Sequence, residues 1–207
     1  MTIAKNANNT QPPSALGKPL LLDVSNTTLH VTPEQFDSLC IDNPDLRLEL
    51  SKDGELIAMT PAFPISGKQN ATLIIRVGIW NEQTKLGEVF DSSTGYDFTA
   101  IGGGKMSPDV SWIEKSRLEG ISLEEFCPVV PDFIIELRST TDRLSTLQTK
   151  MLEYQRLGVK LGLLINPQDK QVEIYRLKRG VKLLESHTSV NCDDVMPGFS
   201  LDLTGIC

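Results

Sequence analysis

The chain has 207 residues, of which 40% are hydrophobic and 23% charged, and its formal net charge is −7. This length and apolar content suit one globular domain with a sizeable core, and the acidic balance excludes a protein that coats nucleic acid without specificity. The sequence has neither the run of roughly 20 apolar residues of a membrane span nor the basic start and apolar segment of a secretory signal, so we expect a soluble protein with no membrane partner.

Capping, turn and periodicity signals divide the chain into helices and strands. In the first half they predict a short helix from Thr32 to 43, a β-hairpin of 46–50 and 55–59, a long helix over 65–85, and a second hairpin of 88–90 and 96–98. In the second half they predict strands over 107–113 and 131–139, a helix from 141 to 158, and three closing strands over 160–166, 171–177 and 181–185. This order predicts an α/β (α+β) domain with one central mixed β-sheet flanked by helices and preceded by an N-terminal β-hairpin.

Composition also predicts the domain boundary and the compartment. Residues 1–18 are rich in Asn, Thr, Pro and Ser and lack hydrophobic periodicity, which predicts a disordered or loosely docked arm before a single domain over 19–207. The widely separated cysteines predict free thiols in a reducing cytoplasm. Their positions are 40, 127, 192 and 207. Because the chain has only two histidines, a histidine-rich metal site and a Ser-His-Asp triad are both disfavoured.

Two of the predicted strands carry an acid at or beside an apolar run. Asp109 precedes a run over 110–113, and Glu136 follows one over 133–135. Buried carboxylates are costly unless they are paired or bind a metal. These strands therefore predict a divalent-cation site, and the common use of such a site is the hydrolysis of a phosphodiester.

Basic side chains follow these acids along the chain. Strand alternation puts Arg138 on the same face as Glu136, where a guanidinium can clamp a phosphate but cannot serve as a base. Lys150 lies on the next predicted helix, from which a long side chain can reach back over the sheet edge, and Gln148 lies on the opposite flank. We therefore predict Lys150 as the catalytic cation, with Arg138 and Gln148 as candidate phosphate or supporting contacts.

Charge is also unevenly distributed along the sequence. Between Arg138 and Lys182 the chain has ten Lys or Arg and four acids. This excess is compatible with one phosphate-facing surface, but solvated helix and hairpin faces would give the same count. Both interpretations stay open.

In their order, these segments resemble the PD-(D/E)xK nuclease superfamily and, over about residues 30–205, the Uma-two family of restriction-endonuclease-like proteins. The segments that carry the resemblance are Leu48-Glu49-Leu50, Asp53-Gly54-Glu55, Gly87 to Phe90, Ser107 to Ser111, Pro131-Asp132-Phe133, Glu136 to Ser139, Leu147 to Met151, Tyr154, Gly158-Val159 and Asn166-Pro167. The resemblance implies a nuclease core in which Asp109 and Glu136 bind Mg²⁺ or Mn²⁺ together with the backbone carbonyl of Leu137. It also implies that Glu49 joins the metal shell or holds a water molecule.

Two positions depart from the pattern of these nucleases. Arg138 stands where the superfamily has a lysine, so Lys150 would act as a migrated lysine supplied from the helix. Gln69 stands in a region where similar sequences often carry a histidine. These departures concern activity more than fold.

Structural roles for the same acids stay open beside the catalytic ones. Asp109 could cap a turn, Glu136 could pair with Arg138 or Arg143, and Glu49 could face solvent on one side of a hairpin.

Other conspicuous residues are predicted to be structural. Asp132, at the start of its strand, is expected to be exposed. The large aromatic residues are expected in the core rather than as base-stacking platforms; they are Trp80, Trp112 and Tyr154.

The function hypothesis is a Mg²⁺- or Mn²⁺-dependent endodeoxyribonuclease that hydrolyses DNA phosphodiester bonds. Asp109, Glu136, Lys150 and Glu49 would form its site, and a homodimer is expected by analogy. The alternative is a catalytically impaired protein of the same fold that acts as a nucleic-acid-binding or protein-interaction module.

Overall fold

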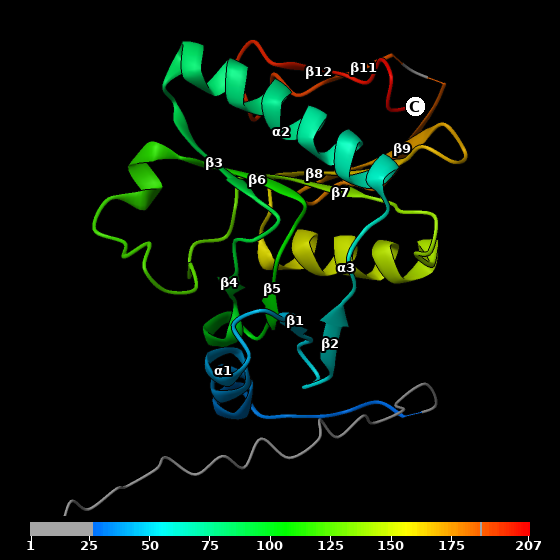
Figure 1. The fold of residues 1–207 in the computed structure, drawn as a ribbon. Helices are drawn as coiled ribbons and strands as arrows, with labels where there is room; N and C mark the ends of the chain where they lie inside the picture. Colours follow the sequence, from blue (N-terminus) through cyan, green and yellow to red (C-terminus); the bar gives the residue numbers. More distant parts are fainter. Residues whose placement is uncertain (1–26, 187) are drawn as a thin grey trace, which may run out of the picture.

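A six-stranded mixed sheet forms the centre of the molecule (Figure 1). The computed structural model describes residues 27–186 and 188–207, so the predicted arm over 1–18 lies outside the described residues. The strand order is β10-β9-β8-β7-β6-β3, and β7 and β8 are parallel while the other neighbours are antiparallel. The strands are β3 (Gly87–Asp91), β6 (Val110–Glu114), β7 (Phe133–Leu137), β8 (Leu161–Asn166), β9 (Gln171–Arg176) and β10 (Lys182–Glu185). The prediction of a central mixed sheet is confirmed.

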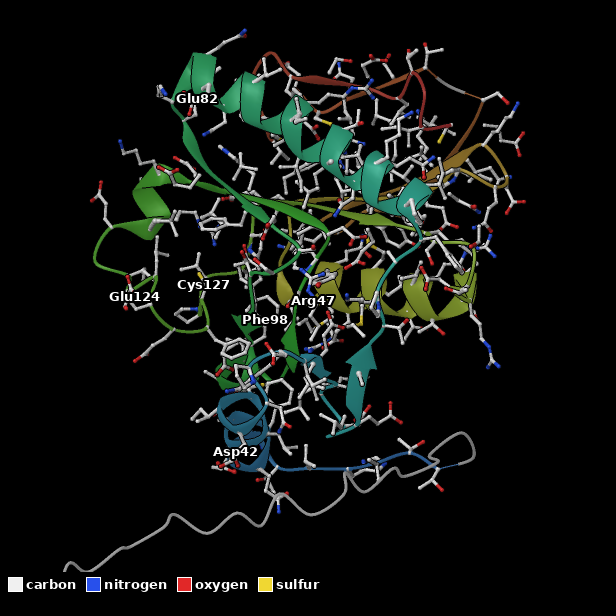
Figure 2. All side chains as sticks on the ribbon, in the orientation of Figure 1. Asp42, Arg47, Glu82, Phe98, Glu124 and Cys127 are labelled. Carbon is white, nitrogen blue, oxygen red and sulfur yellow. The ribbon has the colours of Figure 1, made fainter. Side chains whose placement is uncertain are left out.

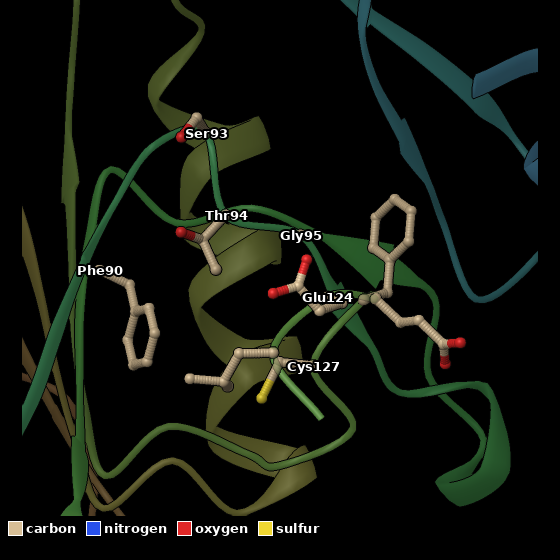
Figure 3. A pocket seen from close by; sticks show the side chains of 9 residues that line it. Phe90, Ser93, Thr94, Gly95, Glu124 and Cys127 are labelled. Carbon is tan, nitrogen blue, oxygen red and sulfur yellow. The ribbon is translucent and has the colours of Figure 1, made fainter. Parts of the chain in front are cut away.

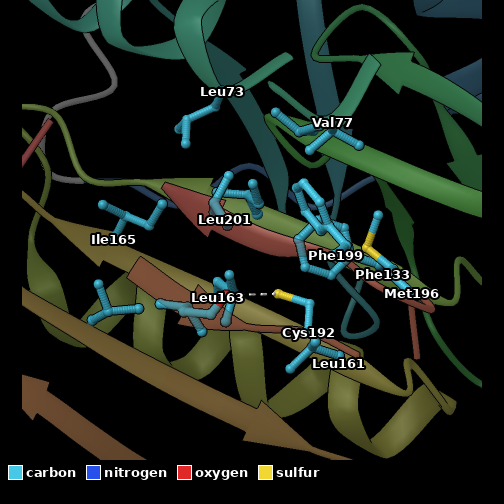
Figure 4. Packing of buried hydrophobic residues seen from close by; sticks show 14 of the residues in the cluster. Leu73, Val77, Phe133, Leu161, Leu163, Ile165, Cys192, Met196, Phe199 and Leu201 are labelled. Carbon is cyan, nitrogen blue, oxygen red and sulfur yellow. Dashed lines mark hydrogen bonds between the residues drawn. The ribbon is translucent and has the colours of Figure 1, made fainter. Parts of the chain in front are cut away.

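Two long helices cover opposite faces of this sheet, as Figure 1 shows. Helix α2 (Pro64–Thr84) buries Leu73 and Val77 against Phe133 and the α2 side of β8, a packing drawn in Figure 4. Helix α3 (Leu144–Leu157) buries Met151 and Tyr154 on the other face. Successive strand residues therefore alternate between two cores. On β7, this alternation directs Glu136 toward α3.

The predicted aromatic core residues are buried. Trp80 and Trp112 are in edge-to-face contact on the α2 side, with ring centroids 5.4 Å apart, and Tyr154 lies in the core under α3. The indole N–H of Trp112 donates to Asn81 Oδ1, which satisfies its polar edge. The aromatic core prediction is confirmed.

A smaller four-stranded sheet and helix α1 (Pro33–Asp42) lie beyond α3, at the bottom of Figure 1. Thr32 and Gln35 form a capping box that begins α1, as the sequence predicts. The small sheet has the order β2-β1-β5-β4. Its strands are β1 (Arg47–Leu50), β2 (Leu56–Met59), β4 (Tyr96–Asp97) and β5 (Lys105–Met106). The N-terminal β1–β2 hairpin is confirmed.

Gly104 allows the small sheet to form beside the site. A Cβ at this position would lie 1.9 Å from the carbonyl oxygen of Leu50, because β5 and β1 approach closely here. Only glycine fits such an approach. The close pairing brings the end of β1, which carries Glu49, against the chain that leads into β6.

The hairpin predicted over 88–98 is wrong. Strand β3 pairs with β6 of the central sheet, whereas β4 pairs with β5 of the small sheet. Between them, Asp91 accepts hydrogen bonds from Ser93, and the chain turns from one sheet to the other. The buried strand β6 needs a partner on each edge, and β3 supplies one of them.

The chain ends in two strands that the sequence pattern did not predict. The three predicted strands are confirmed as β8, β9 and β10, but β11 (Ser189–Asn191) and β12 (Ser200–Asp202) follow them as an antiparallel pair. Three residues are too few for strand periodicity to be visible. The pair lies beside α2 in Figure 1, and Arg76 of α2 donates to the carbonyls of Asp202 and Thr204.

The surface of the described residues has a mixed character. Figure 2 shows Asp42 and Glu82 at the outer ends of α1 and α2, while Phe98 lies inside. Helix α2 exposes Ile75 and Ile79, yet no helix in the described part of the chain is long and apolar enough to cross a membrane.

All four cysteines are free thiols, as predicted.

Asp132 is buried, which overturns the expectation of an exposed acid. Its side chain is 1% exposed and lies 2.6 Å from Arg117 Nη1 and 2.7 Å from Lys160 Nζ. It also accepts a hydrogen bond from the Glu114 N–H at 2.9 Å. Both cations come from outside the strands, so local alternation could not reveal them. Asp132 therefore joins the end of β6 to the starts of β7 and β8.

We predict that Asp132→Asn lowers the free energy of unfolding at pH 7 by about 2 kcal/mol. Burial alone would raise the pKa of Asp132, but the Glu114 N–H, Lys160 and Arg117 together hold it below its ordinary value. The folded-state pKa thus lies below the unfolded one, so this stability is complete above the unfolded value and is lost as pH falls through the folded value. Urea unfolding from pH 7 down to pH 3 measures the difference in free energy of unfolding between wild type and Asp132→Asn.

The matched control is Asp53→Asn, because Asp53 forms an exposed ion pair with Lys52. This change is expected to alter stability by less than about 0.5 kcal/mol. If the difference in free energy of unfolding between wild type and Asp132→Asn did not become smaller at low pH, this result would contradict the structural role of Asp132.

Candidate active site at the carboxylate strands

Asp109 and Glu136 lie side by side on the α3 face of the central sheet. Strands β6 and β7 are antiparallel with Val110 opposite Ile135, and extending this register by one pair sets Asp109 opposite Glu136. Side chains at such positions share a face, with Cβ atoms about 5 Å apart. In agreement, Asp109 Oδ2 accepts a hydrogen bond from the Leu137 N–H at 2.8 Å. The two acids of the sequence prediction therefore meet.

The ammonium group of Lys150 lies between two buried carboxylates. Lys150 Nζ is 2.9 Å from Glu49 Oε1 and 2.9 Å from Glu136 Oε1, and it donates to the Ser107 carbonyl at 3.1 Å. Lys150 projects from α3, Glu49 from β1 and Glu136 from β7. One cation thus ties a helix to both sheets.

Glu49 does not face solvent, so the solvent-facing alternative is wrong. The residue is 5% exposed, and its Oε1 also accepts a hydrogen bond from the Ser107 N–H at 2.8 Å. In a two-stranded hairpin one face would be open, but here Lys150 of α3 lies against that face, and β5 extends the sheet beside β1. Ser107 contributes only backbone atoms to this contact, so no sequence signal could have indicated its role.

Three acids surround one cation at the site. Burial, aided by Asp109 and Glu49 and opposed by Lys150, raises the pKa of Glu136 to about 8. Burial also raises the pKa of Asp109, despite the hydrogen bond from Leu137. Burial disfavours the Lys150 ammonium too, but Glu136 and Glu49 outweigh it and hold the pKa of Lys150 well above its ordinary value. Lys150 therefore stays charged, and one cation faces three acids.

One oxygen of this cluster lacks a hydrogen bond. Glu136 Oε1 is buried, and although it is close to Lys150, it has no hydrogen-bond partner among the described residues. No group of three or more His, Cys, Asp or Glu side chains in residues 27–186 and 188–207 is arranged to hold a metal. Two carboxylates and a backbone carbonyl are nevertheless oxygen donors of the kind that Mg²⁺ and Mn²⁺ prefer. Within the described ranges, Glu136 Oε1 has an ion pair with Lys150 but no contact of hydrogen-bond geometry, and three acids share one ammonium group; both features fit a divalent cation held by Asp109 and Glu136.

Arg138 is near the site but is bound away from Glu136. Its guanidinium donates to Asn166 Oδ1 at 3.3 Å and lies 3.2 Å from Asp169 Oδ2. The alternative in which Glu136 pairs with Arg138 or Arg143 is therefore wrong, since its ion-pair partner is Lys150. Sequence analysis missed Asn166 and Asp169, whose link to Arg138 arises because the loops after β7 and β8 are neighbours.

Gln148 is not part of the carboxylate cluster. Its amide donates to Glu173 Oε1 on β9 at 2.7 Å, and Glu173 also accepts from the Tyr175 hydroxyl. This contact fixes α3 against the sheet two residues before Lys150. Gln148 is thus in a position to support the lysine indirectly.

The basic residues between 138 and 182 do not gather at one end of the sheet. Arg138 and Lys170 are in the loops after β7 and β8, next to the site. Lys160 and Arg176 lie at the opposite end of the sheet, where Leu161 pairs with Arg176. Several of these cations are also neutralised locally, as in the pair of Arg176 with Asp194.

A separate surface hollow of about 430 Å³ lies away from these residues. Phe90, Thr94, Glu124 and Cys127 line it, as Figure 3 shows. None of the candidate site residues lines this hollow. Its acidic lining does not suit a phosphate backbone, so the carboxylate strands remain the candidate site.

We predict that Lys150→Met lowers the free energy of unfolding by about 3 kcal/mol in EDTA, because it leaves Glu49 and Glu136 buried without their cation. Urea unfolding measures the change. Lys85→Met is the matched control, since Lys85 forms an exposed pair with Glu82, and it is expected to have little effect. A Lys150→Met protein as stable as wild type would show that the ion pairs do not hold the site together.

Comparison with known proteins agrees with this fold. The model of the Uma2 family, described as "Putative restriction endonuclease", matches residues 33–204. A crystal structure described as "a putative nuclease belonging to DUF820", from Anabaena variabilis ATCC 29413, has a TM-score of 0.67 and 17% sequence identity, covering 76% of this chain and 87% of that chain. This likeness shows the fold. No match was found among curated proteins. Because the family match covers most of its length, the chain belongs to the Uma2 family of restriction-endonuclease-like proteins.

Proposed function

We propose that the chain is a metal-dependent endodeoxyribonuclease that hydrolyses DNA phosphodiester bonds with Mg²⁺ or Mn²⁺, using a PD-(D/E)xK-type site. The observation that carries this proposal is the meeting of Asp109 and Glu136 on one face, with the Lys150 ammonium 2.9 Å from Glu136. Two acids and a lysine at the end of a buried sheet suit phosphodiester hydrolysis. Membership of a family described as restriction endonucleases supports the same reaction.

The cation would be held by Asp109, Glu136 and the backbone carbonyl of Leu137. When bound, it would polarise a phosphoryl oxygen and lower the pKa of a water molecule. Glu49 and Glu136 contact the same Lys150 ammonium, which supports a role for Glu49 in the metal shell or in holding that water. Strand backbones fix both acids, so little rearrangement is needed on binding.

Lys150 supplies the positive group of the reaction. Its ammonium stays protonated, so it can position the attacking water or stabilise the negative charge that develops on the phosphate. Because the lysine comes from α3 rather than from β7, Arg138 is free for another task. Asp169 and Asn166 hold Arg138 beside the site, where it can contact a neighbouring phosphate, and Gln148 supports the helix.

The remaining parts of the proposal concern assembly and location. We propose one domain over 19–207, a homodimer with one site for each DNA strand, and a cytoplasmic location that suits four free thiols. The dimer is proposed by analogy with nucleases of this type.

We predict that Asp109→Ala and Glu136→Gln each reduce cleavage of plasmid DNA in Mg²⁺ by at least about 100-fold, because each removes a proposed ligand of the cation. Gel analysis of supercoiled, nicked and linear DNA measures the rate. Glu82→Gln, an exposed change on α2, is the control and should leave the rate unchanged. Unchanged cleavage by both site variants would overturn the assignment.

A non-catalytic module is the second candidate, because Lys150 already neutralises part of the carboxylate charge. Such a protein would retard DNA in a gel, or capture a protein partner, without cleaving DNA in Mg²⁺ or Mn²⁺. It would also bind Mn²⁺ weakly or not at all. A wild-type protein that cleaves DNA excludes this alternative.

A further inference from the structure

The three tyrosines of the chain are buried, but their hydroxyl groups differ. Tyr96 shares a hydrogen bond of 2.6 Å with Ser111 Oγ, and the Tyr175 hydroxyl donates to Glu173 at 2.5 Å. The Tyr154 hydroxyl is buried and has no hydrogen-bond partner among residues 27–186 and 188–207. A buried hydroxyl without a partner is destabilising, and phenylalanine would avoid this cost. The hydroxyl group of Tyr154 therefore needs an explanation other than packing.

Tyr154 adjoins the carboxylate cluster. It follows Lys150 by one helical turn, and the Lys150 ammonium lies 5.8 Å from the centroid of its ring. The rings of Phe98 and Tyr154 are in edge-to-face contact, with centroids 6.4 Å apart, which helps to fix the tyrosine ring. The hydroxyl remains protonated, because burial raises the pKa of Tyr154 well above its ordinary value, and Glu136 and Glu49 add to this effect against Lys150. Tyr154 thus offers a permanent O–H donor.

Among the described residues, a buried donor without a partner and a buried acceptor that is engaged only by an ion pair lie around the same ammonium group. The donor is the Tyr154 hydroxyl, and the acceptor is Glu136 Oε1. The Lys150 ammonium lies over the ring of Tyr154, and its Nζ is 2.9 Å from Glu136 Oε1. Carboxylates that bind metals are usually held by a hydrogen bond from a neighbouring group. At Glu136 the Lys150 ammonium, 2.9 Å from Oε1, is in this position, and in the described residues no second donor to Oε1 accompanies it.

We propose that Tyr154 is a positioning residue for Glu136, and that its hydroxyl is the reserve donor that holds Oε1 when a cation bound at Glu136 displaces the Lys150 ammonium from this oxygen. This inference rests on the proposed function, in which Glu136 binds the cation and Lys150 serves the reaction. Tyr154 touches neither substrate nor cation. It acts through Glu136, by keeping the carboxylate in one orientation while its ion pair loosens.

The test compares Tyr154→Phe with Tyr96→Phe in the full-length protein. In EDTA, Tyr154→Phe should melt at or above the wild-type temperature, by up to about 4 °C, because it removes an unpartnered buried hydroxyl. Titration with MnCl₂ should show affinity about tenfold weaker than wild type, because Glu136 loses its support. Tyr96→Phe should show the reverse pattern, with a lower melting temperature and unchanged affinity for Mn²⁺.

Three results would overturn the inference. If Tyr154→Phe melts below wild type, as Tyr96→Phe should, the hydroxyl is a structural hydrogen-bond donor. If wild type binds Mn²⁺ and Tyr154→Phe binds it equally well, Tyr154 does not position Glu136, while the proposed function stands. If wild type does not bind Mn²⁺, the proposed function fails and this inference fails with it.

Discussion

The structure of this protein depends on one buried ammonium group. Lys150 bridges Glu49 and Glu136 at 2.9 Å each, and through them it joins α3 to the small sheet and to the central sheet. A buried charge is tolerated only when it is well paired, so each of the three side chains needs the others. Gly104 makes the arrangement possible, since only a residue without Cβ lets β5 lie close enough to β1 for Glu49 to reach Ser107. The candidate active site and the contact between the two sheets are therefore the same cluster.

This overlap sets stability against function. Burial first, and then its acidic neighbours, raise the pKa of Glu136 to about 8 against the effect of Lys150, so the free protein holds this carboxyl largely protonated near neutral pH. Packed hydrophobic residues would hold the elements together at lower cost. A divalent cation would favour the ionised carboxylate and stabilise it by binding. The same group of buried acids that weakens the free protein is what makes a cation site physically reasonable here.

The sequence predicted elements whose signals are local and missed contacts that are distant. The capping box at Thr32, the turn at Gly54 and the apolar period of α3 each act within a few residues, so the helices, the first hairpin and the central strands were predictable. Asp109 and Glu136 could be paired because each has a recognisable strand around it. The burial of Glu49 depends on Lys150, which is 101 residues away, and buried Asp132 is paired with Arg117 from a short 3-10 helix and Lys160 from a loop. No pattern along the chain records such partners, and β11 and β12 are too short to show a strand period.

The position of the lysine has a consequence beyond its charge. A lysine on β7 would be fixed by the strand that carries Glu136, whereas Lys150 is fixed by α3, whose neighbouring turns are packed through Met151 and Tyr154. Gln148 ties the same helix to Glu173 on β9. The distance between the cation and Glu136 is therefore determined by how α3 sits on the sheet. Because Arg138 is anchored separately by Asp169 at 3.2 Å, a shift of α3 would move the lysine and leave the arginine in place. Lys150 and Arg138 are thus held by different elements, which suits separate roles in the chemistry and in phosphate contact.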